Sequence, residues 1–264
     1  MIDEAWLEAA LAVAREAAAA GAAAIARHTP ERVDVEYKAD ASPVTVADRE
    51  AETEIRRVLL AHYPDHAIFG EEQGHQGDGD FLWLADPLDG TKSFVRGTPF
   101  YSTQIALMHR GELLLGVSAA PHYGETLWAR RGGGAWMNGQ PIHVAATQRV
   151  RDAVLSTGNV RTLAGNALKW RELGDLIGEV NRIRGYGDFC HYHLLARGGV
   201  DIVIESDVNI LDIAALAVIV REAGGVFTDL HGQPLSLDTR SVLACVPGLH
   251  EPIAWRFHSE TECC

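Results

Sequence analysis

The pattern of apolar residues changes near residue 150, and this change constrains the fold of the 264-residue chain more than any other feature. Before it, apolar segments are joined by tight turns such as Arg110-Gly111, a pattern typical of antiparallel hairpins. After it, short apolar runs alternate with helical segments, which predicts an α/β arrangement. The length is compatible with one large domain or with two closely packed lobes.

Local signals predict the individual elements. Thr45-Val46-Ala47-Asp48 fits a capping box, and apolar residues at helical spacing follow it until just before Pro64. The apolar run Phe81–Ala85 predicts a buried strand that follows an acidic, glycine-rich loop over residues 70–80. We also expect helices over Met1–His28, Asn166–Val180, Phe189–Arg197 and Leu211–Ala223, and strands over Ala153–Thr157, Val200–Glu205 and Val226–Thr228.

Charge and composition exclude several classes of function. The formal net charge of -13 argues against a nucleic-acid surface and against electrostatic docking on anionic membranes. Bound divalent cations would reconcile this acidity with an anionic substrate. The N-terminal segment opens on acidic residues and lacks an apolar run near 20 residues, so we expect neither a signal peptide nor a membrane span.

Residue types that often bind metals need separate interpretation. The four cysteines match neither a zinc knuckle nor a disulfide framework, which predicts a reduced, cytoplasmic protein with Cys263-Cys264 in a solvated tail. His191 and His193 lie two apart on a predicted helix, so they face different directions and we interpret them as structural. The Gly132-Gly133-Gly134 run lacks the context of a phosphate-binding loop and is interpreted as a hairpin turn.

The segment Asp86-Pro87-Leu88-Asp89-Gly90-Thr91 has the composition of a metal and phosphate site. Asp86 follows the predicted strand and Asp89 comes three residues later across a Pro-containing turn, so both carboxylates can point into one volume. Such carboxylates repel each other unless a cation lies between them, and oxygen ligands favour Mg²⁺ or Mn²⁺. A helix that starts at Thr91 would direct free amides at a phosphate. An Asp-Gly surface turn is the alternative interpretation.

Further carboxylates occur in the predicted loops and helix starts. Glu71 lies with Glu72 upstream of the segment, Asp48 lies earlier still, and Asp212 lies near the start of the predicted helix Leu211–Ala223. Each also has a purely structural interpretation, as part of a solvated loop, as a helix cap or as a first-turn acid. Their occurrence in this order favours a shared metal site.

This ordered set closely resembles the inositol-monophosphatase superfamily, and the resemblance includes Lys38, the segment Ser42–Asp48 and the run that ends at Gly225. It implies a layered α-β-α-β-α sandwich like that of inositol monophosphatase and fructose-1,6-bisphosphatase. An α+β lobe over residues 1–150 would carry most metal ligands, and an α/β lobe over residues 151–264 would carry substrate-recognition residues and the last ligand. It also implies a homodimer. One departure is Leu211, where family members usually have Trp.

The resemblance implies two or three Mg²⁺ ions per site, with Mn²⁺ as a possible substitute, and hydrolysis of a small phosphate ester by an activated water. One ion would be held by Glu71, Asp86 and the Leu88 carbonyl, a second by Asp86, Asp89 and Asp212, and Glu71 would contribute to a third. Asp48 and Thr91, together with Glu71, would orient or activate the water. Asp89 and the amides of Gly90 and Thr91 would bind the phosphate.

The segments Asp89–Phe94, Gly185–Phe189 and Ala196–Glu205 resemble the histidinol-phosphatase branch of the superfamily. Histidinol phosphate carries cationic groups, so the expected substrate contacts are the carboxylates of Asp188 and Glu205. Asp188 could instead cap the following helix. The alternatives are an inositol-1-monophosphatase of broad specificity, an adenosine 3',5'-bisphosphate phosphatase and a metabolite-sensing protein without catalysis.

Overall fold

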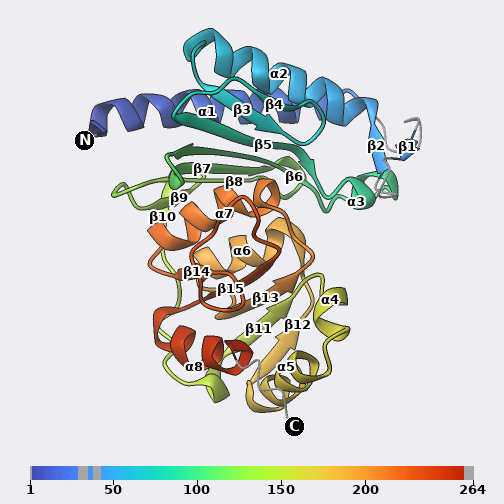
Figure 1. Ribbon diagram of the computed structural model, residues 1–264, viewed down its shortest axis with the longest axis vertical. Helices are drawn as coiled ribbons and strands as arrows, with labels where there is room; N and C mark the ends of the chain where they lie inside the picture. The colour runs from blue at the N-terminus through green and yellow to red at the C-terminus, as the bar shows by residue number, and fades with distance from the viewer. Residues whose placement is uncertain (1, 29–34, 38–42, 259–264) are drawn as a thin grey trace. The chain divides into compact units, whose positions relative to one another are not determined.

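The computed structural model describes residues 2–28, 35–37 and 43–258, and contacts divide the chain into two compact units (Figure 1). The first unit comprises Met1–Pro141 with Leu211–Glu222, and the second comprises Ile142–Ile210 with Ala223–Cys264. The sequence prediction for Lys38, Ser42 and the Cys263-Cys264 pair lies outside the described residues.

A mixed eight-stranded sheet forms the centre of the first unit. Its strands are β3 (Ala67–Gly70), β4 (Gly74–Gln76), β5 (Phe81–Asp89), β6 (Ser102–His109), β7 (Glu112–Ala120), β8 (Glu125–Arg130), β9 (Ala135–Met137) and β10 (Gln140–Ile142). They are ordered β10-β9-β8-β7-β6-β5-β3-β4. Strands β5 to β9 pair antiparallel in chain order, as the predicted hairpins require, while β3 pairs with β5 in parallel. A separate antiparallel pair joins β1 (Val35–Tyr37) and β2 (Pro43–Thr45).

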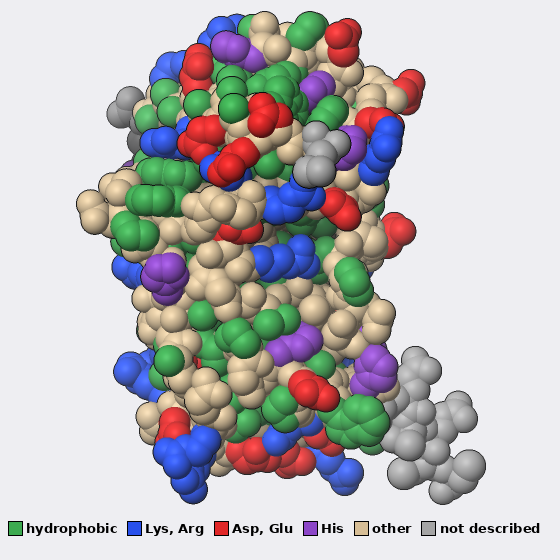
Figure 2. Space-filling model, turned by 90° about the vertical axis from the view of Figure 1, so that its left-hand side faces the viewer, with side chains coloured by type: hydrophobic (Ala, Val, Ile, Leu, Met, Phe, Trp, Pro, Cys, Tyr) green, Lys and Arg blue, Asp and Glu red, His purple; other side chains and the backbone are tan. Residues whose placement is uncertain are grey.

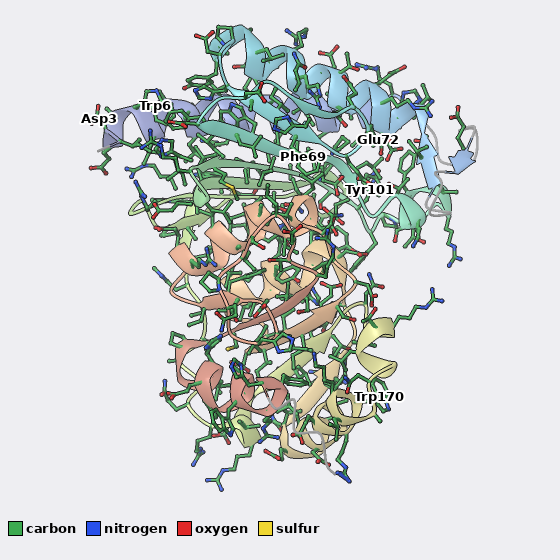
Figure 3. All side chains as sticks on the ribbon, in the orientation of Figure 1. Asp3, Trp6, Phe69, Glu72, Tyr101 and Trp170 are labelled. Atoms are coloured by element: carbon green, nitrogen blue, oxygen red, sulfur yellow. The ribbon has the colours of Figure 1, made fainter. Side chains whose placement is uncertain are left out.

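Two long helices, α1 (Glu4–Ile25) and α2 (Val46–His62), pack against each other and against this sheet (Figure 1). The predicted capping box starts α2, because the side chain of Thr45 and the side chain of Asp48 each accept a backbone hydrogen bond there. Trp6 of α1, labelled in Figure 3, packs against Phe81 with tilted rings and 4.9 Å between the ring centroids. The helices and the sheet thus bury one continuous apolar core.

Helix α7 (Ile210–Glu222) lies against the opposite face of the same sheet. Leu115 and Val117 of β7 face the core beneath α1, so the intervening Gly116 faces the other way. A Cβ atom at Gly116 would lie only 2.7 Å from the Cα atom of Ala215, so only glycine permits this approach of α7. We expected this helix in the C-terminal lobe, whereas its contacts place it in the first unit.

The last residue of α7 is also fixed to the sheet. Glu222 accepts hydrogen bonds of 2.9 Å from the backbone amides of Gly132 and Gly134, in the turn between β8 and β9. The glycine run predicted to be a plain turn is therefore a turn whose amides bind a carboxylate of the protein itself.

The second unit contains a five-stranded sheet ordered β12-β11-β13-β15-β14. Its strands are β11 (Val154–Thr157), β12 (Arg182–Arg184), β13 (Ile202–Ser206), β14 (Val226–Thr228) and β15 (Ser241–Cys245), and its helices are α4 (Arg161–Ala164), α5 (Ala167–Glu179), α6 (Asp188–Ala196) and α8 (Pro247–His258). Parallel pairing of β11 with β12 and β13 gives the α/β character predicted for this half, and the antiparallel β15 makes the sheet mixed.

Several short or atypical elements escaped prediction. The strands β4, β12 and β15 and the helices α4 and α8 were not expected. Helix α8 contains Pro252, which normally argues against a helix interior. No helix formed by the described residues is long and apolar enough to cross a bilayer. Acidic and basic side chains are interspersed over the face drawn in Figure 2.

Candidate metal and phosphate site

A bulge in β5 brings Asp86 and Asp89 to the same side of the sheet. Asp86 pairs with Gln104 and Asp89 pairs with Ser102, so three steps along β5 correspond to two along β6. In a regular strand, residues three apart face opposite sides, and one extra residue in a bulge corrects this. The sequence prediction of a strand that ends at Ala85 and a Pro-containing turn is wrong, because β5 continues through Asp89.

Asp212 of α7 completes a group of three carboxylates. One oxygen from each of Asp86, Asp89 and Asp212 lies within 4.8 Å of the others. Asp212 lies in the first turn of α7, as predicted, and the preceding Leu211 is 5% exposed. Leu211 is thus buried, although it is smaller than the Trp that the resemblance implies at this position.

Burial and mutual repulsion make this group of carboxylates a candidate cation site. The pKa of Asp86 is raised well above its usual range, first by burial and then by the negative charges of Glu71, Asp89 and Asp212. The Glu71 side chain is also hydrogen-bonded to Asp86. A divalent cation would remove the repulsion. Since the side-chain donors are all carboxylate oxygens, the group fits Mg²⁺ or Mn²⁺ better than zinc or copper.

A buried carboxylate and a hydroxyl lie beside the bulge. Thr91 Oγ1 is 2.9 Å from Asp48 Oδ1 and 3.0 Å from the Leu88 carbonyl oxygen, and it can donate to either. Burial raises the pKa of Asp48, and hydrogen bonds from Thr45 and Thr91 oppose that rise. The cap predicted for Asp48 is present, so this carboxylate both starts α2 and contacts Thr91.

Gly90 allows the chain to leave the bulge and begin the short helix α3 (Thr91–Val95). Its φ is 94°, and a Cβ atom there would lie 2.6 Å from the Phe100 carbonyl oxygen. Only glycine satisfies both conditions without strain. The predicted helix start at Thr91 is confirmed, while phosphate binding by its amides stays a prediction.

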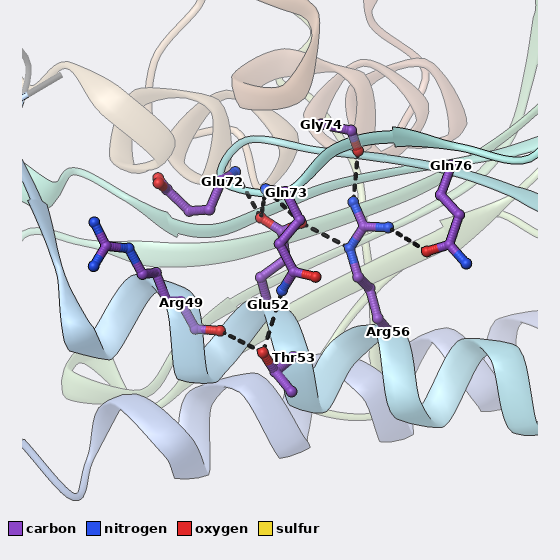
Figure 4. A network of polar contacts seen from close by, with 8 residues as sticks. All are labelled: Arg49, Glu52, Thr53, Arg56, Glu72, Gln73, Gly74 and Gln76. Carbon is purple, nitrogen blue, oxygen red and sulfur yellow. Dashed lines mark hydrogen bonds and ion pairs between the residues drawn. The ribbon is translucent and has the colours of Figure 1, made fainter. Parts of the chain in front are cut away.

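A buried ion pair, missed in the sequence, holds the turn that carries Glu71 (Figure 4). The carboxylate of Glu52 accepts hydrogen bonds from the backbone amides of Glu72 and Gln73 and from Arg56 Nε, at 2.7–3.3 Å. Arg56 in turn donates to the Gly74 carbonyl oxygen at 2.6 Å. The available signal was a Glu and an Arg four residues apart beside the apolar stripe of the predicted helix.

The two residues predicted to contact the substrate lie in the second unit. Asp188 is the first residue of α6 and has a φ of +44°, so the helix cap is Gly187 and not Asp188. A left-handed conformation at a non-glycine residue costs about 1 kcal/mol and is often found at functional sites. Glu205 is only 3% exposed.

Both oxygens of Glu205 already bind protein groups. Oε1 accepts from the Asn159 amide at 3.0 Å, and Oε2 accepts from Tyr192 at 2.8 Å and lies 3.1 Å from His191 Nε2. His191 Nδ1 lies 3.4 Å from Ser156 Oγ. Both His191 and the nearby His193 are buried, which agrees with the structural interpretation of these histidines.

Similarity to known proteins covers nearly the whole chain. Residues 6–262 match the inositol monophosphatase family. A histidinol-phosphatase of Mycobacterium tuberculosis is 41% identical over 206 residues, which cover 75% of this chain and 78% of the relative. An inositol-1-monophosphatase of Rhizobium meliloti is 36% identical over 217 residues, which cover 81% of this chain and 82% of the relative.

Solved structures support the same relationship. The extragenic suppressor protein suhB from Bartonella henselae has a TM-score of 0.87 and 31% identity, over 96% of this chain and 99% of its own. This similarity confirms the predicted layered sandwich. Because the match extends over residues 6–262, the protein belongs to the inositol monophosphatase family of phosphatases.

Proposed function

We propose that the protein is a Mg²⁺-dependent phosphomonoesterase that hydrolyses L-histidinol phosphate to L-histidinol and phosphate, a step of histidine synthesis. The gathering of Asp86, Asp89 and Asp212 within 4.8 Å carries the proposal of a metal-dependent reaction. The 41% identity to a histidinol-phosphatase favours this substrate. The inositol-1-monophosphatase at 36% identity favours inositol phosphate as the alternative.

In this proposal Asp86, Asp89 and Asp212, with Glu71 and the Leu88 carbonyl, hold the ions. When bound, Mg²⁺ supplies Lewis acidity, which lowers the pKa of water and stabilises the leaving alkoxide. The protein's own residues place the water and the ester for an in-line attack.

Thr91 and Asp48 are proposed to orient and activate the attacking water, with the Asp48 carboxylate as the final proton acceptor through Thr91 Oγ1. A hydroxyl that donates to Asp48 keeps its lone pairs, so Thr91 Oγ1 can accept a hydrogen bond from the water while its own hydrogen points at Asp48 Oδ1. The pKa of Asp48 is raised by burial, which makes this carboxylate a stronger base than an exposed one. Asp89 and the amides of Gly90 and Thr91 are the proposed phosphate contacts.

Asp188 is the stronger candidate for substrate recognition. Its left-handed backbone favours a functional role, and a carboxylate can pair with a cationic amino alcohol. Glu205 is the weaker candidate, because its oxygens are occupied by Asn159, Tyr192 and His191. We propose that it supports the substrate region from within the second unit.

A substrate panel in Mg²⁺ tests this function. We expect a higher kcat/KM for L-histidinol phosphate than for inositol 1-phosphate or adenosine 3',5'-bisphosphate. Asp188→Asn should raise the KM for histidinol phosphate roughly tenfold or more, since a hydrogen bond to a charged group is lost, and should affect inositol phosphate much less. A preference for inositol phosphate would reject the substrate, and no phosphate release from any ester would reject the enzymatic function.

Two further proposals concern the state of the protein in the cell. We propose a homodimer, which light scattering of the purified protein tests directly. We also propose a cytoplasmic location, which fits the free thiol of Cys245. Fractionation of the source cells tests that location.

A further inference from the structure

Two buried polar residues of β6 form a hydrogen-bond chain that ends on Asp89. Gln104 Nε2 donates to Ser102 Oγ at 2.7 Å, and Ser102 Oγ donates to Asp89 Oδ2 at 3.1 Å. Ser102 and Gln104 are both fully buried. Both hydrogen bonds therefore run in the direction of Asp89, whose ionised carboxylate can only accept.

Strand pairing explains why these two side chains reach the site. Ser102 and Gln104 lie two apart on β6, so they face the same side of the sheet. They pair with Asp89 and Asp86, the two residues on either side of the bulge in β5. The bulge thus sets the two carboxylates against two polar side chains of the neighbouring strand.

The side-chain amide of Gln104 lowers the stability of the fold, so stability does not explain its presence. Among the residues that the structure describes, Gln104 Oε1 has no hydrogen-bond partner although it is buried. An unpaired buried acceptor destabilises a fold, and an apolar side chain of similar length would avoid this cost. If the amide were turned over, Oε1 would accept the Ser102 hydrogen, and the bond to Asp89 would be lost. The orientation that supports Asp89 is therefore the one with the unpaired acceptor.

We propose that Ser102 and Gln104 are positioning residues for the metal site, with Gln104 acting through Ser102 to fix the rotation of the Asp89 carboxylate. The inference rests on the proposed function, because Asp89 is a metal ligand only in that proposal. Hydrogen-bond partners of metal ligands commonly change metal affinity by roughly 10- to 100-fold when removed.

Isothermal titration calorimetry tests the inference, with Mn²⁺ added to the purified full-length protein in the absence of substrate. Ser102→Ala should weaken Mn²⁺ binding by roughly tenfold or more. Gln104→Met should weaken it by roughly three- to tenfold while the metal-free protein melts at the same temperature or higher, because the unpaired acceptor is gone. The double variant should bind Mn²⁺ no more weakly than Ser102→Ala.

Reference variants separate the possible failures. Asp89→Asn should abolish the strong Mn²⁺ site; if it binds as the wild type does, the proposed metal site itself is wrong. If Asp89→Asn fails to bind while Ser102→Ala and Gln104→Met bind normally, only the positioning role is wrong. Additive losses in the double variant would also reject it, since the two residues would then act separately.

Two variants guard against misleading losses. Ser241→Ala removes a hydroxyl that accepts from the Leu230 amide in the second unit, and it should leave Mn²⁺ affinity unchanged. If Ser102→Ala does not fold, Ser102→Cys leaves no cavity and retains a weaker donor at the same position, and it should show the same direction of change. Wild-type affinity in a folded Ser102→Cys variant would count against the proposal.

Discussion

Replacement of Gly116 by alanine tests whether the position of α7 sets the geometry of the proposed metal site. The new Cβ atom would lie 2.7 Å from the Ala215 Cα atom, whereas carbon atoms in contact lie about 3.5–4.0 Å apart, so α7 must retreat by about 1 Å. The obstructing atom is backbone, so no side-chain rotation relieves the clash. Asp212 lies three residues from Ala215 on the same face of α7 and moves with it.

The expected effect on activity is large. Mg²⁺ requires near-octahedral geometry with oxygen distances of about 2.1 Å, and a misplacement of about 1 Å in a catalytic site costs roughly 100-fold in rate. We expect Gly116→Ala to lower kcat/KM by roughly 100-fold and to raise the Mg²⁺ concentration for half-maximal activity. Its free energy of unfolding should fall by about 1–3 kcal/mol, as in other overpacked cores.

The assay compares phosphate release over a Mg²⁺ series with urea unfolding of the same preparation. Gly174→Ala is the matched control, because it adds the same methyl group in α5, where no atom apart from its chain neighbours and the adjacent backbone of the same helix lies within 4 Å. It should stabilise the protein by about 0.5–1 kcal/mol and leave the Mg²⁺ dependence unchanged. A folded Gly116→Ala protein with normal Mg²⁺ dependence would refute the argument that α7 places Asp212.

Three further predictions concern buried groups. Glu52→Gln leaves Arg56 charged and buried, so urea unfolding should show a loss of about 3–5 kcal/mol, whereas Glu54→Gln, in an exposed ion pair, should change stability by less than about 0.5 kcal/mol. Because the folded-state pKa of Asp86 is raised, the metal-free protein should lose stability as pH rises above the unfolded-state pKa of about 4. Added Mg²⁺ should restore more stability at pH 8 than at pH 5. A melting temperature that does not depend on pH would contradict this prediction. Burial raises the pKa of the Cys245 thiol to about 12, so iodoacetamide at pH 8 should label it only after denaturation, and labelling in the folded state would disprove this.

Local chemistry made some elements predictable. The start of α2 follows from Thr45 and Asp48 alone, since a capping box depends on residues three apart. The start of α5 is confirmed at Asn166, whose side chain accepts from the amides of Leu168 and Lys169. In each case the deciding contact lies within one turn of chain.

The bulge in β5 was not predictable in the same way. Asp86-Pro87-Leu88-Asp89 has the composition of a turn, and only pairing with Ser102 and Gln104 on β6 shows that it belongs to a strand. The same long-range pairing gives Ser102 and Gln104 their position beside Asp89, and nothing in their immediate sequence indicates it. The sequence thus predicted which carboxylates gather, while the groups that hold them depend on register between strands.

The insertion of α7 into the first unit has a consequence for how the protein is made. The sheet that ends at β10 leaves the ribosome before the segment Ile142–Ile210, which separates it from α7. Until α7 follows, the face of β7 at Gly116 lacks its covering helix and the two aspartates of β5 lack Asp212. Contacts so distant in the chain slow folding and leave apolar surface exposed to aggregation. If the metal site is as proposed, a nascent chain or a fragment that stops before α7 should bind the divalent ion weakly, because it lacks Asp212.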